Sequence, residues 1–137
     1  MTTDTRKSRA PASTAKVILV VDDDPSVRSL ITKTLQTKGY EVEQAVDGLD
    51  ASKQLRNAPR PPDLIICDVM MPMIDGFSFA RIVRSDALLR SVPILFLSAK
   101  SDPSSIVQGI SLGAIHYMQK PFRIAELLEK VERTLSG

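Results

Sequence analysis

Residues 17–25 read Val-Ile-Leu-Val-Val-Asp-Asp-Asp-Pro, and the fold of the chain can be inferred outward from this stretch. Five consecutive aliphatic residues are typical of a parallel strand that helices cover on both faces. Asp24 followed by Pro25 indicates a helix start, because Asp caps free backbone N–H groups and Pro fits the first helical position. The stretch therefore predicts a buried strand that ends in carboxylates and leads directly into a helix.

The same alternation of an apolar run and a helical pattern occurs five times. The runs are residues 17–21, 40–45, 64–67, 94–97 and 115–119. The first, third and fourth are almost continuously apolar, whereas the second alternates between apolar and polar residues like an edge strand. We therefore expect an α/β protein of (βα)5 type, a three-layer sandwich around a parallel sheet of five strands.

Several helix limits can also be predicted. Gly39 is placed to end the first helix, and Asp102 followed by Pro103 repeats the start signal of Asp24 and Pro25. The last helix is expected over about residues 124–135. Its apolar stripe consists of Leu127, Leu128, Val131 and Leu135.

Length and charge restrict the class of protein. A chain of 137 residues with 43% hydrophobic residues fits one domain, which we place at residues 16–137. Residues 1–15 are predicted to be a disordered basic tail. Because the first 16 residues hold four basic side chains and one acidic, the remainder is nearly neutral, and we expect no direct nucleic-acid binding. No segment approaches the roughly 18 apolar residues of a membrane span, so we expect a cytoplasmic protein.

Polar residues gather where the predicted strands end. The first strand is followed by Asp22 and Asp23, the third by Asp68, the fourth by Ser98 and the fifth by Lys120. The carboxyl ends of parallel strands meet at one edge of the sheet, where ligands bind in such folds. Clustered carboxylates favour a hard cation such as Mg²⁺. An ammonium could neutralise, and a hydroxyl could hydrogen-bond, the oxygens of a phosphoryl group carried on one of them.

These residues lie within motifs that resemble the receiver domains of bacterial response regulators. The motifs are residues 18–28, residues 63–76, Leu97-Ser98-Ala99, Gly113-Ala114 and Lys120-Pro121-Phe122. The resemblance covers about residues 16–135, with the motifs in the family's order and spacing. It implies a flavodoxin-like fold with strand order 2-1-3-4-5.

The resemblance also implies roles for the acidic residues. Asp68 resembles the phosphoacceptor of the family, and Asp22 with Asp23 resembles the acidic pair that organises Mg²⁺. The implied metal ligands are Asp23, Asp68 and the backbone carbonyl of Met70, with Asp22 acting indirectly. The implied chemistry is phosphorylation of the domain itself and slow dephosphorylation, so we do not expect an enzyme acting on other substrates.

The remaining motif residues resemble the parts that carry the signal. Ser98 resembles the switch hydroxyl, Tyr117 the aromatic switch residue and Lys120 the lysine that contacts phosphate, with a cis peptide before Pro121. The implied phosphodonor is a histidine kinase, a histidine phosphotransfer protein or a small molecule such as acetyl phosphate. The implied signalling surface comprises the fourth helix, the last strand and the last helix, and it would bind a downstream protein or a second receiver.

The main alternative is a phosphatase similar to the haloacid dehalogenases, with Asp22 as nucleophile. The spacing of Asp22 and Asp24 fits that motif, but the sequence shows no acidic pair after Lys120 and is short for that fold. A flavin-binding flavodoxin would need a Ser/Thr-rich phosphate loop where the chain has acids. A receiver that works without phosphate is disfavoured because every expected site residue is present.

Overall fold

The computed structural model describes residues 15–99 and 102–136, so the predicted tail lies, except for Ala15, outside the described residues. Five strands and five helices alternate in the described part of the chain. They are β1 (Val17–Val21), α2 (Pro25–Thr37), β2 (Glu41–Ala45), α3 (Gly48–Asn57), β3 (Leu64–Asp68), α4 (Gly76–Ser85), β4 (Ile94–Ser98), α5 (Pro103–Ser111), β5 (Ala114–Gln119) and α6 (Ile124–Ser136).

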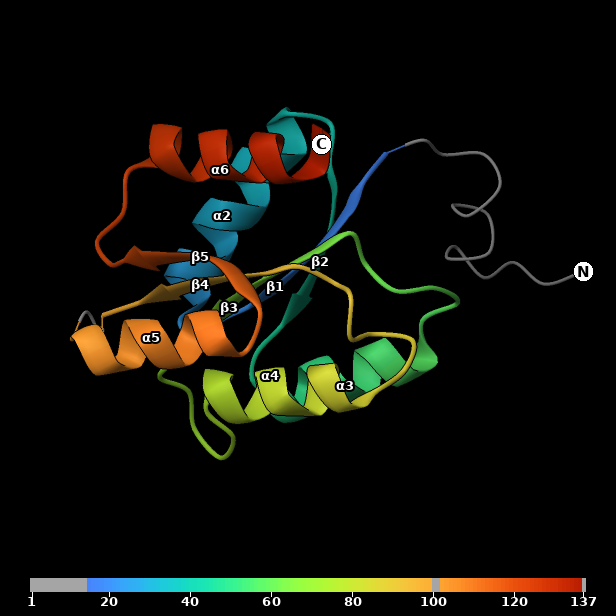
Figure 1. Cartoon of the computed structure of the whole chain (residues 1–137). Helices are drawn as coiled ribbons and strands as arrows, with labels where there is room; N and C mark the ends of the chain where they lie inside the picture. Colours follow the sequence, from blue (N-terminus) through green and yellow to red (C-terminus); the bar gives the residue numbers. More distant parts are fainter. Residues whose placement is uncertain (1–14, 100–101, 137) are drawn as a thin grey trace, which may run out of the picture.

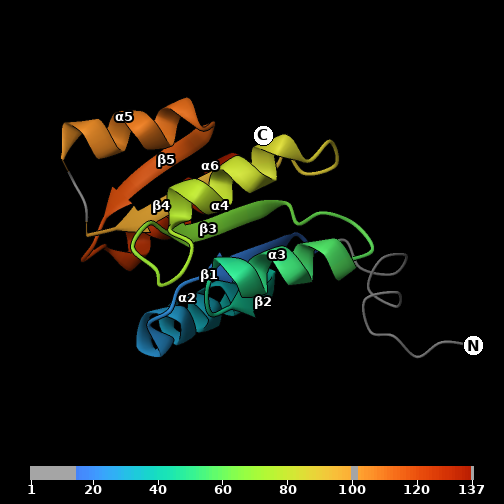
Figure 2. The ribbon, with the colours of Figure 1, turned by 90° about the horizontal axis from the view of Figure 1, so that it is seen from below.

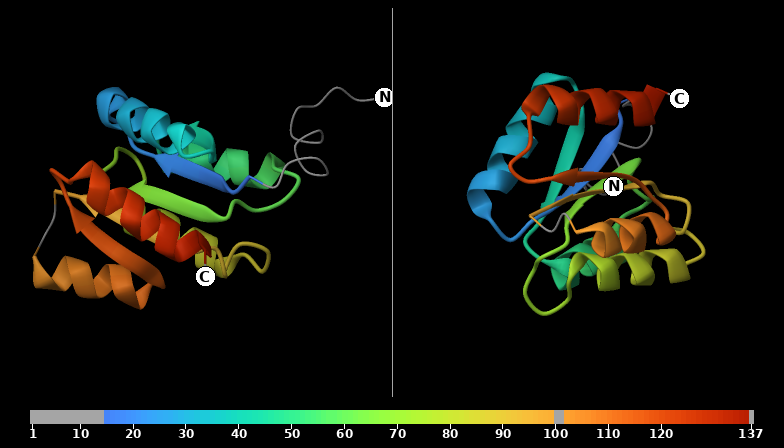
Figure 3. Two further views of the ribbon diagram at one scale, coloured as in Figure 1. Left: turned by 90° about the horizontal axis from the view of Figure 1, so that it is seen from above. Right: turned by 60° about the vertical axis from the view of Figure 1, so that its left-hand side comes forward.

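All strand pairs are parallel, and the sheet has the order β2-β1-β3-β4-β5. The predicted (βα)5 sandwich and its strand order are confirmed. Helices α2 and α6 cover one face, and α3, α4 and α5 cover the other (Figures 1 and 2). In Figure 3, the left view looks onto the layer of α2 and α6, and the right view shows the sheet between this layer and the layer of α3, α4 and α5. Because every strand runs in the same direction, all five carboxyl ends lie at one edge.

A hydrophobic core fills the space on each side of the sheet. Phe79 and Phe96 belong to the core under α3, α4 and α5, while Ile31 and Leu127 belong to the core under α2 and α6. Strands β1, β3 and β4 are buried along their whole length, as their apolar runs predict. No helix in the described ranges is long and apolar enough to cross a membrane.

The local signals in the sequence explain the limits of the elements. Asp24 accepts hydrogen bonds from the N–H groups of Ser26 and Val27, so its expected role as a cap is confirmed. Gly39 follows α2 at φ +89°, a conformation that glycine adopts without the steric cost of a side chain. Tyr40 was predicted to begin β2, but its N–H donates to the Leu35 carbonyl and it closes the helix end instead.

The strand limits place two polar residues inside the sheet. The ladder pairs Asp68 with Leu97 and Ser98 with Gln119, so β3 and β4 each extend one residue beyond the predicted apolar run. Cys67, directly before Asp68, is a buried free cysteine in β3, as expected for a small core residue. The two polar residues are therefore the last residues of β3 and β4, directly after the apolar run of each strand.

Candidate functional site

Three aspartates form a cluster at the carboxyl edge of the sheet. Asp22 and Asp23 follow β1, Asp68 ends β3, and one carboxylate oxygen from each lies within 4.8 Å of those of the other two. Asp22 is 2% exposed and Asp68 is 6% exposed, whereas Asp23 is open to solvent. Negative groups this close repel one another unless a cation lies among them, so this cluster favours the binding of a cation.

Lys120 supplies one positive charge to this cluster. It follows β5, and its Nζ lies 2.8 Å from Oδ2 of Asp22 and 3.1 Å from Oδ2 of Asp68. Burial on its own lowers the pKa of Lys120, but hydrogen bonds and the negative charges of Asp22 and Asp68 outweigh burial, and the pKa is raised. The Lys120–Pro121 peptide bond is cis, as the family resemblance implies. The ammonium therefore stays charged between two carboxylates from different strands.

Asp68 is held from two sides. Its Oδ1 accepts the Met70 N–H at 3.1 Å, while Oδ2 accepts Lys120. Burial raises the pKa of Asp68; the hydrogen bonds from Met70 and Lys120 and the charge of Lys120 oppose this, and the charge of Asp22 adds to it. The carboxyl group is thus oriented before any ligand binds.

The loop after Asp68 depends on a close backbone approach at Gly76. The Gly76 N–H donates to the Val69 carbonyl at 2.8 Å. A Cβ at position 76 would lie 2.8 Å from Cα of Val69 and closer still to the carbonyl oxygen of Asp68. Only glycine fits here without moving the end of β3, so the placement of Asp68 relies on this residue.

Ser98 and Tyr117 lie beside the cluster and contact each other. Ser98 is fully buried at the end of β4. Burial raises the pKa of Tyr117, and a hydrogen bond with the Ser98 side chain partly opposes this. The Tyr117 ring packs at centroid distances of 6.0 Å from Phe96 and 6.5 Å from Phe77. The hydroxyl expected to meet a ligand is therefore linked directly to the aromatic ring of β5.

Helix α5 approaches the same ring through a glycine. A Cβ on Gly109 would lie only 2.9 Å from Cδ2 of Tyr117 and 3.2 Å from Cδ2 of Phe96. The missing side chain at position 109 leaves room for the half-buried Tyr117 ring under α5. Because the contact is this close, movement of the Tyr117 ring would displace α5.

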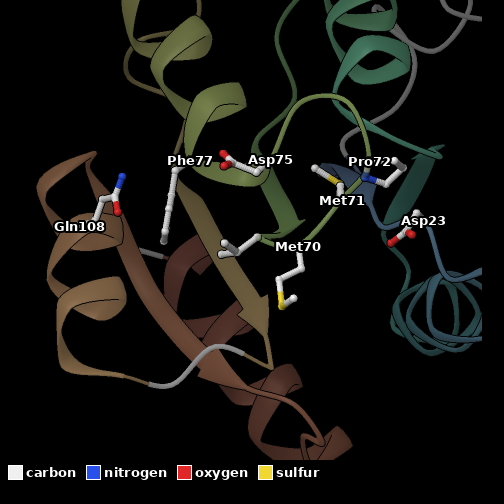
Figure 4. Close-up of a pocket in the computed structure, with 8 residues that line it drawn as sticks. Asp23, Met70, Met71, Pro72, Asp75, Phe77 and Gln108 are labelled. Atoms are coloured by element: carbon white, nitrogen blue, oxygen red, sulfur yellow. The ribbon is translucent and has the colours of Figure 1, made fainter.

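A cavity of about 520 Å³ opens next to the aspartate cluster. Figure 4 shows its lining, with Met70 between Asp23 and Asp75 in this view and with Phe77 and Gln108 on the side of α5. The Met70 side chain is 56% exposed. The cavity gives a ligand of phosphoryl size access to the acidic edge of the sheet.

Arg28 is a site neighbour to which sequence reasoning assigned no role. Its Nη1 donates to the backbone carbonyl of Asp22 at 2.7 Å, one helical turn after the Asp24 cap. A basic residue in the second turn of a helix that follows an acidic strand end is the signal that could have revealed it. The residues predicted for the site, Asp22, Asp23, Asp68 and Lys120, do lie together, with Ser98 and Tyr117 adjacent.

Comparisons with known proteins agree with this geometry. A family model described as the response regulator receiver domain matches residues 18–132. The chain is 38% identical over 118 residues to the DNA-binding dual master transcriptional regulator RpaA of Synechocystis sp., covering 86% of this chain and 48% of that protein. It is 42% identical over 118 residues to the response regulator MprA of Mycobacterium sp. (strain KMS), covering 86% of this chain and 50% of MprA.

The chain therefore spans about half the length of these curated relatives. Among solved structures, the chemotaxis protein CheY4 of Vibrio cholerae superimposes with a TM-score of 0.81 at 38% identity. That similarity covers 88% of this chain and 98% of the CheY4 chain.

Proposed function

The chain belongs to the family of response regulator receiver domains, and we propose that it is a magnesium-dependent phosphorylation switch that carries its phosphoryl group on Asp68. The observation that supports this most is the cluster of Asp22, Asp23 and Asp68 with Lys120 bonded to two of its members. Asp68 ends the central strand β3, and its carboxylate accepts hydrogen bonds from the Met70 N–H and from the Lys120 ammonium.

The donor set fits a hard divalent cation. Mg²⁺ prefers oxygen ligands, keeps several of its waters and needs few protein carboxylates. We propose that Asp23, Asp68 and the backbone carbonyl of Met70 hold it, and that Asp22 acts indirectly because its carboxylate already accepts from Lys120 and from the Asp24 N–H. When bound, the ion neutralises negative charge on the phosphoryl group and on the carboxylates during transfer.

The phosphoryl transfer itself needs a nucleophile and an external donor. One Asp68 carboxylate oxygen forms a bond to phosphorus while the bond from phosphorus to the donor breaks, and that bond's electron pair leaves with the donor. The donor is a histidine of a kinase or a histidine phosphotransfer protein, or an acyl phosphate such as acetyl phosphate. Lys120 and Ser98 stabilise the phosphoryl oxygens, and slow attack by water returns Asp68 to its free state.

We propose that the signal passes through Ser98 and Tyr117. A phosphoryl oxygen competes with Tyr117 for the Ser98 hydroxyl, so phosphorylation changes the position of the Tyr117 ring under α5. The surface formed by α5, β5 and α6 then has two conformations. Because the phosphoryl group makes better contacts in one of them, phosphorylation shifts the population toward that conformation. This surface exposes Val107, Ile110 and Ile115, and it would bind a downstream protein or a second receiver.

We propose that residues 16–137 form the receiver domain and that it works in the cytoplasm beside its phosphodonor. The family match over residues 18–132 supports the first of these statements.

Labelling with acetyl phosphate and Mg²⁺ tests the acceptor and its rival in one experiment. Mass spectrometry should find one base-labile phosphoryl group on the wild-type chain and none on Asp68→Asn. The phosphatase alternative makes Asp22 the nucleophile and requires turnover of small phosphate esters. Labelling that persists in Asp68→Asn and disappears in Asp22→Asn would replace our proposal with that alternative.

A further inference from the structure

The two peptide groups that flank Asp23 are both fixed by side chains. On one side, the N–H of Asp24 donates to Oδ1 of Asp22 at 2.9 Å. On the other side, the carbonyl of Asp22 accepts from Nη1 of Arg28 at 2.7 Å. Asp23 itself is exposed, at the rim of the cavity beside Met70. Its backbone is therefore held while its carboxylate is free to meet a cation.

Arg28 is in turn held by the edge strand. Its Nε donates to Oε1 of Gln44 at 3.3 Å. Gln44 lies in β2, beside Val20 of β1, and its carbonyl accepts from Nε2 of Gln54 in α3 at 2.6 Å. The guanidinium thus links the turn after β1 to a neighbouring strand that is itself tied to a helix.

We propose that Arg28 is a positioning residue for the divalent cation, which keeps the Asp22–Asp23 peptide, and with it the Asp23 carboxylate, in the geometry that binds the ion. Gln44 acts through Arg28 by orienting its guanidinium. This inference rests on the proposed magnesium site. Groups that orient metal ligands without touching the metal commonly change affinity by about 10–100-fold.

The charge of Arg28 has the opposite effect from its positioning role. A positive charge near the cluster repels a divalent cation, so its removal by itself would strengthen cation binding. Loss of the hydrogen bond to the Asp22 carbonyl would weaken binding instead. The sign of the change in magnesium affinity therefore separates the two roles.

The test is a magnesium titration of matched variants at constant ionic strength, by calorimetry and by the amide signals of residues 22–24. Arg28→Ala should weaken magnesium binding by about 10-fold. Arg28→Lys should recover part of this, since an ammonium can donate to the Asp22 carbonyl but lacks the planar fork that also reaches Gln44. Gln44→Ala should weaken binding less than Arg28→Ala. Lys33→Ala, an exposed residue of the same helix, should leave the affinity within about twofold, because it removes charge alone.

Three results would overturn the positioning role of Arg28. Unchanged or tighter binding in Arg28→Ala would overturn the inference while leaving the magnesium site intact. A lower melting temperature without magnesium, combined with an unchanged dissociation constant, would show a purely structural role and would also overturn it. Absence of magnesium binding in the wild type would remove both the proposed function and this inference. Should Arg28→Ala fail to fold, Gln44→Ala and Arg28→Lys still carry the test, and equal affinity in both and the wild type would reject it.

Discussion

Lys120 and Arg84 are both partly buried cations, but they are held by different kinds of oxygen. Lys120 contacts the carboxylates of Asp22 and Asp68 at the carboxyl edge of the sheet. Arg84, in the last turn of α4, donates to four backbone carbonyls, those of Leu112, Arg90, Val92 and Gly113. The neutral acceptors of Arg84 are fixed by the fold, whereas the carboxylates that contact Lys120 can bind a metal cation or a proton.

Arg84 makes a structural contact, whereas the contact of Lys120 can respond to cations and to pH. Arg84 joins the end of α4 to the loops before β4 and β5, and its contacts do not involve any titrating partner. Burial lowers the pKa of Arg84, while the net effect at Lys120 is a raised pKa. We infer that stability at the amino edge of the sheet is insensitive to ligand and pH, and that stability at the carboxyl edge depends on both.

The largest expected effect is the loss of Arg84. Arg84→Ala leaves four carbonyl oxygens without this donor, two of them in partly buried hydrogen bonds, and we expect a loss of about 3 kcal/mol in the free energy of unfolding. Urea unfolding measures this. The exposed Arg81→Ala in the same helix should change stability by no more than about 0.5 kcal/mol. A loss in Arg84→Ala that magnesium reverses would break the distinction between the two edges.

Lys120→Ala should cost less, and the cost should depend on pH. Near neutral pH we expect a loss of about 2 kcal/mol, because Asp22 and Asp68 lose the charged donor of their hydrogen bonds from the partly exposed Lys120. The pKa of Asp68 is already raised in the folded protein, and removing Lys120 raises it further. The folded variant then binds a proton more readily than the unfolded chain, so its stability recovers as the pH falls through the raised pKa toward the usual value of 3.8.

Urea unfolding of both variants at neutral and mildly acidic pH checks this. The deficit of Lys120→Ala should shrink on acidification, while that of Arg84→Ala stays constant. A Lys120→Ala deficit of the same size at both pH values would contradict the electrostatic account.

Magnesium should produce a smaller gain in stability. At a concentration about ten times the dissociation constant, a ligand that binds only the folded state adds about 1.4 kcal/mol. Millimolar Mg²⁺ should therefore raise the melting temperature of the wild type, and Asp23→Ala should abolish the rise. Glu129→Ala, which removes an exposed acid of α6, should keep it. An unchanged melting temperature in the wild type would argue against a preformed site.

The smallest effect is expected for a third cation that is solvent-exposed. Arg133 lies 3.0 Å from Glu129 one turn earlier in α6, and the two side chains are 66% and 61% exposed. Arg133→Ala should cost about 0.3–0.5 kcal/mol at low salt and nothing measurable at high salt. A loss of stability that persists at high salt would mean that solvent exposure does not determine how much each of these three cations contributes to stability.

The sequence was sufficient for the parallel strands and for the acidic cluster because both follow from pattern and topology, whereas the strand order was implied by the resemblance to receiver domains. Apolar runs predicted the strands, and parallel strands bring Asp22, Asp68 and Lys120 to one edge. The contacts of Arg28 and Arg84 were harder to predict, because both side chains donate to backbone carbonyls, which every residue possesses. The contact between Ser98 and Tyr117 also depends on side-chain packing that no spacing encodes.

Cys67 makes the central strand chemically observable. It is the only cysteine of the chain, and its thiol is fully buried directly before Asp68. Burial and the charges of Asp68 and Asp22 hold the pKa of this thiol well above its usual value. A thiol-reactive dye can therefore label Cys67 only after β3 separates from its neighbours. The labelling rate measures how often the strand that carries Asp68 opens, without any engineered probe.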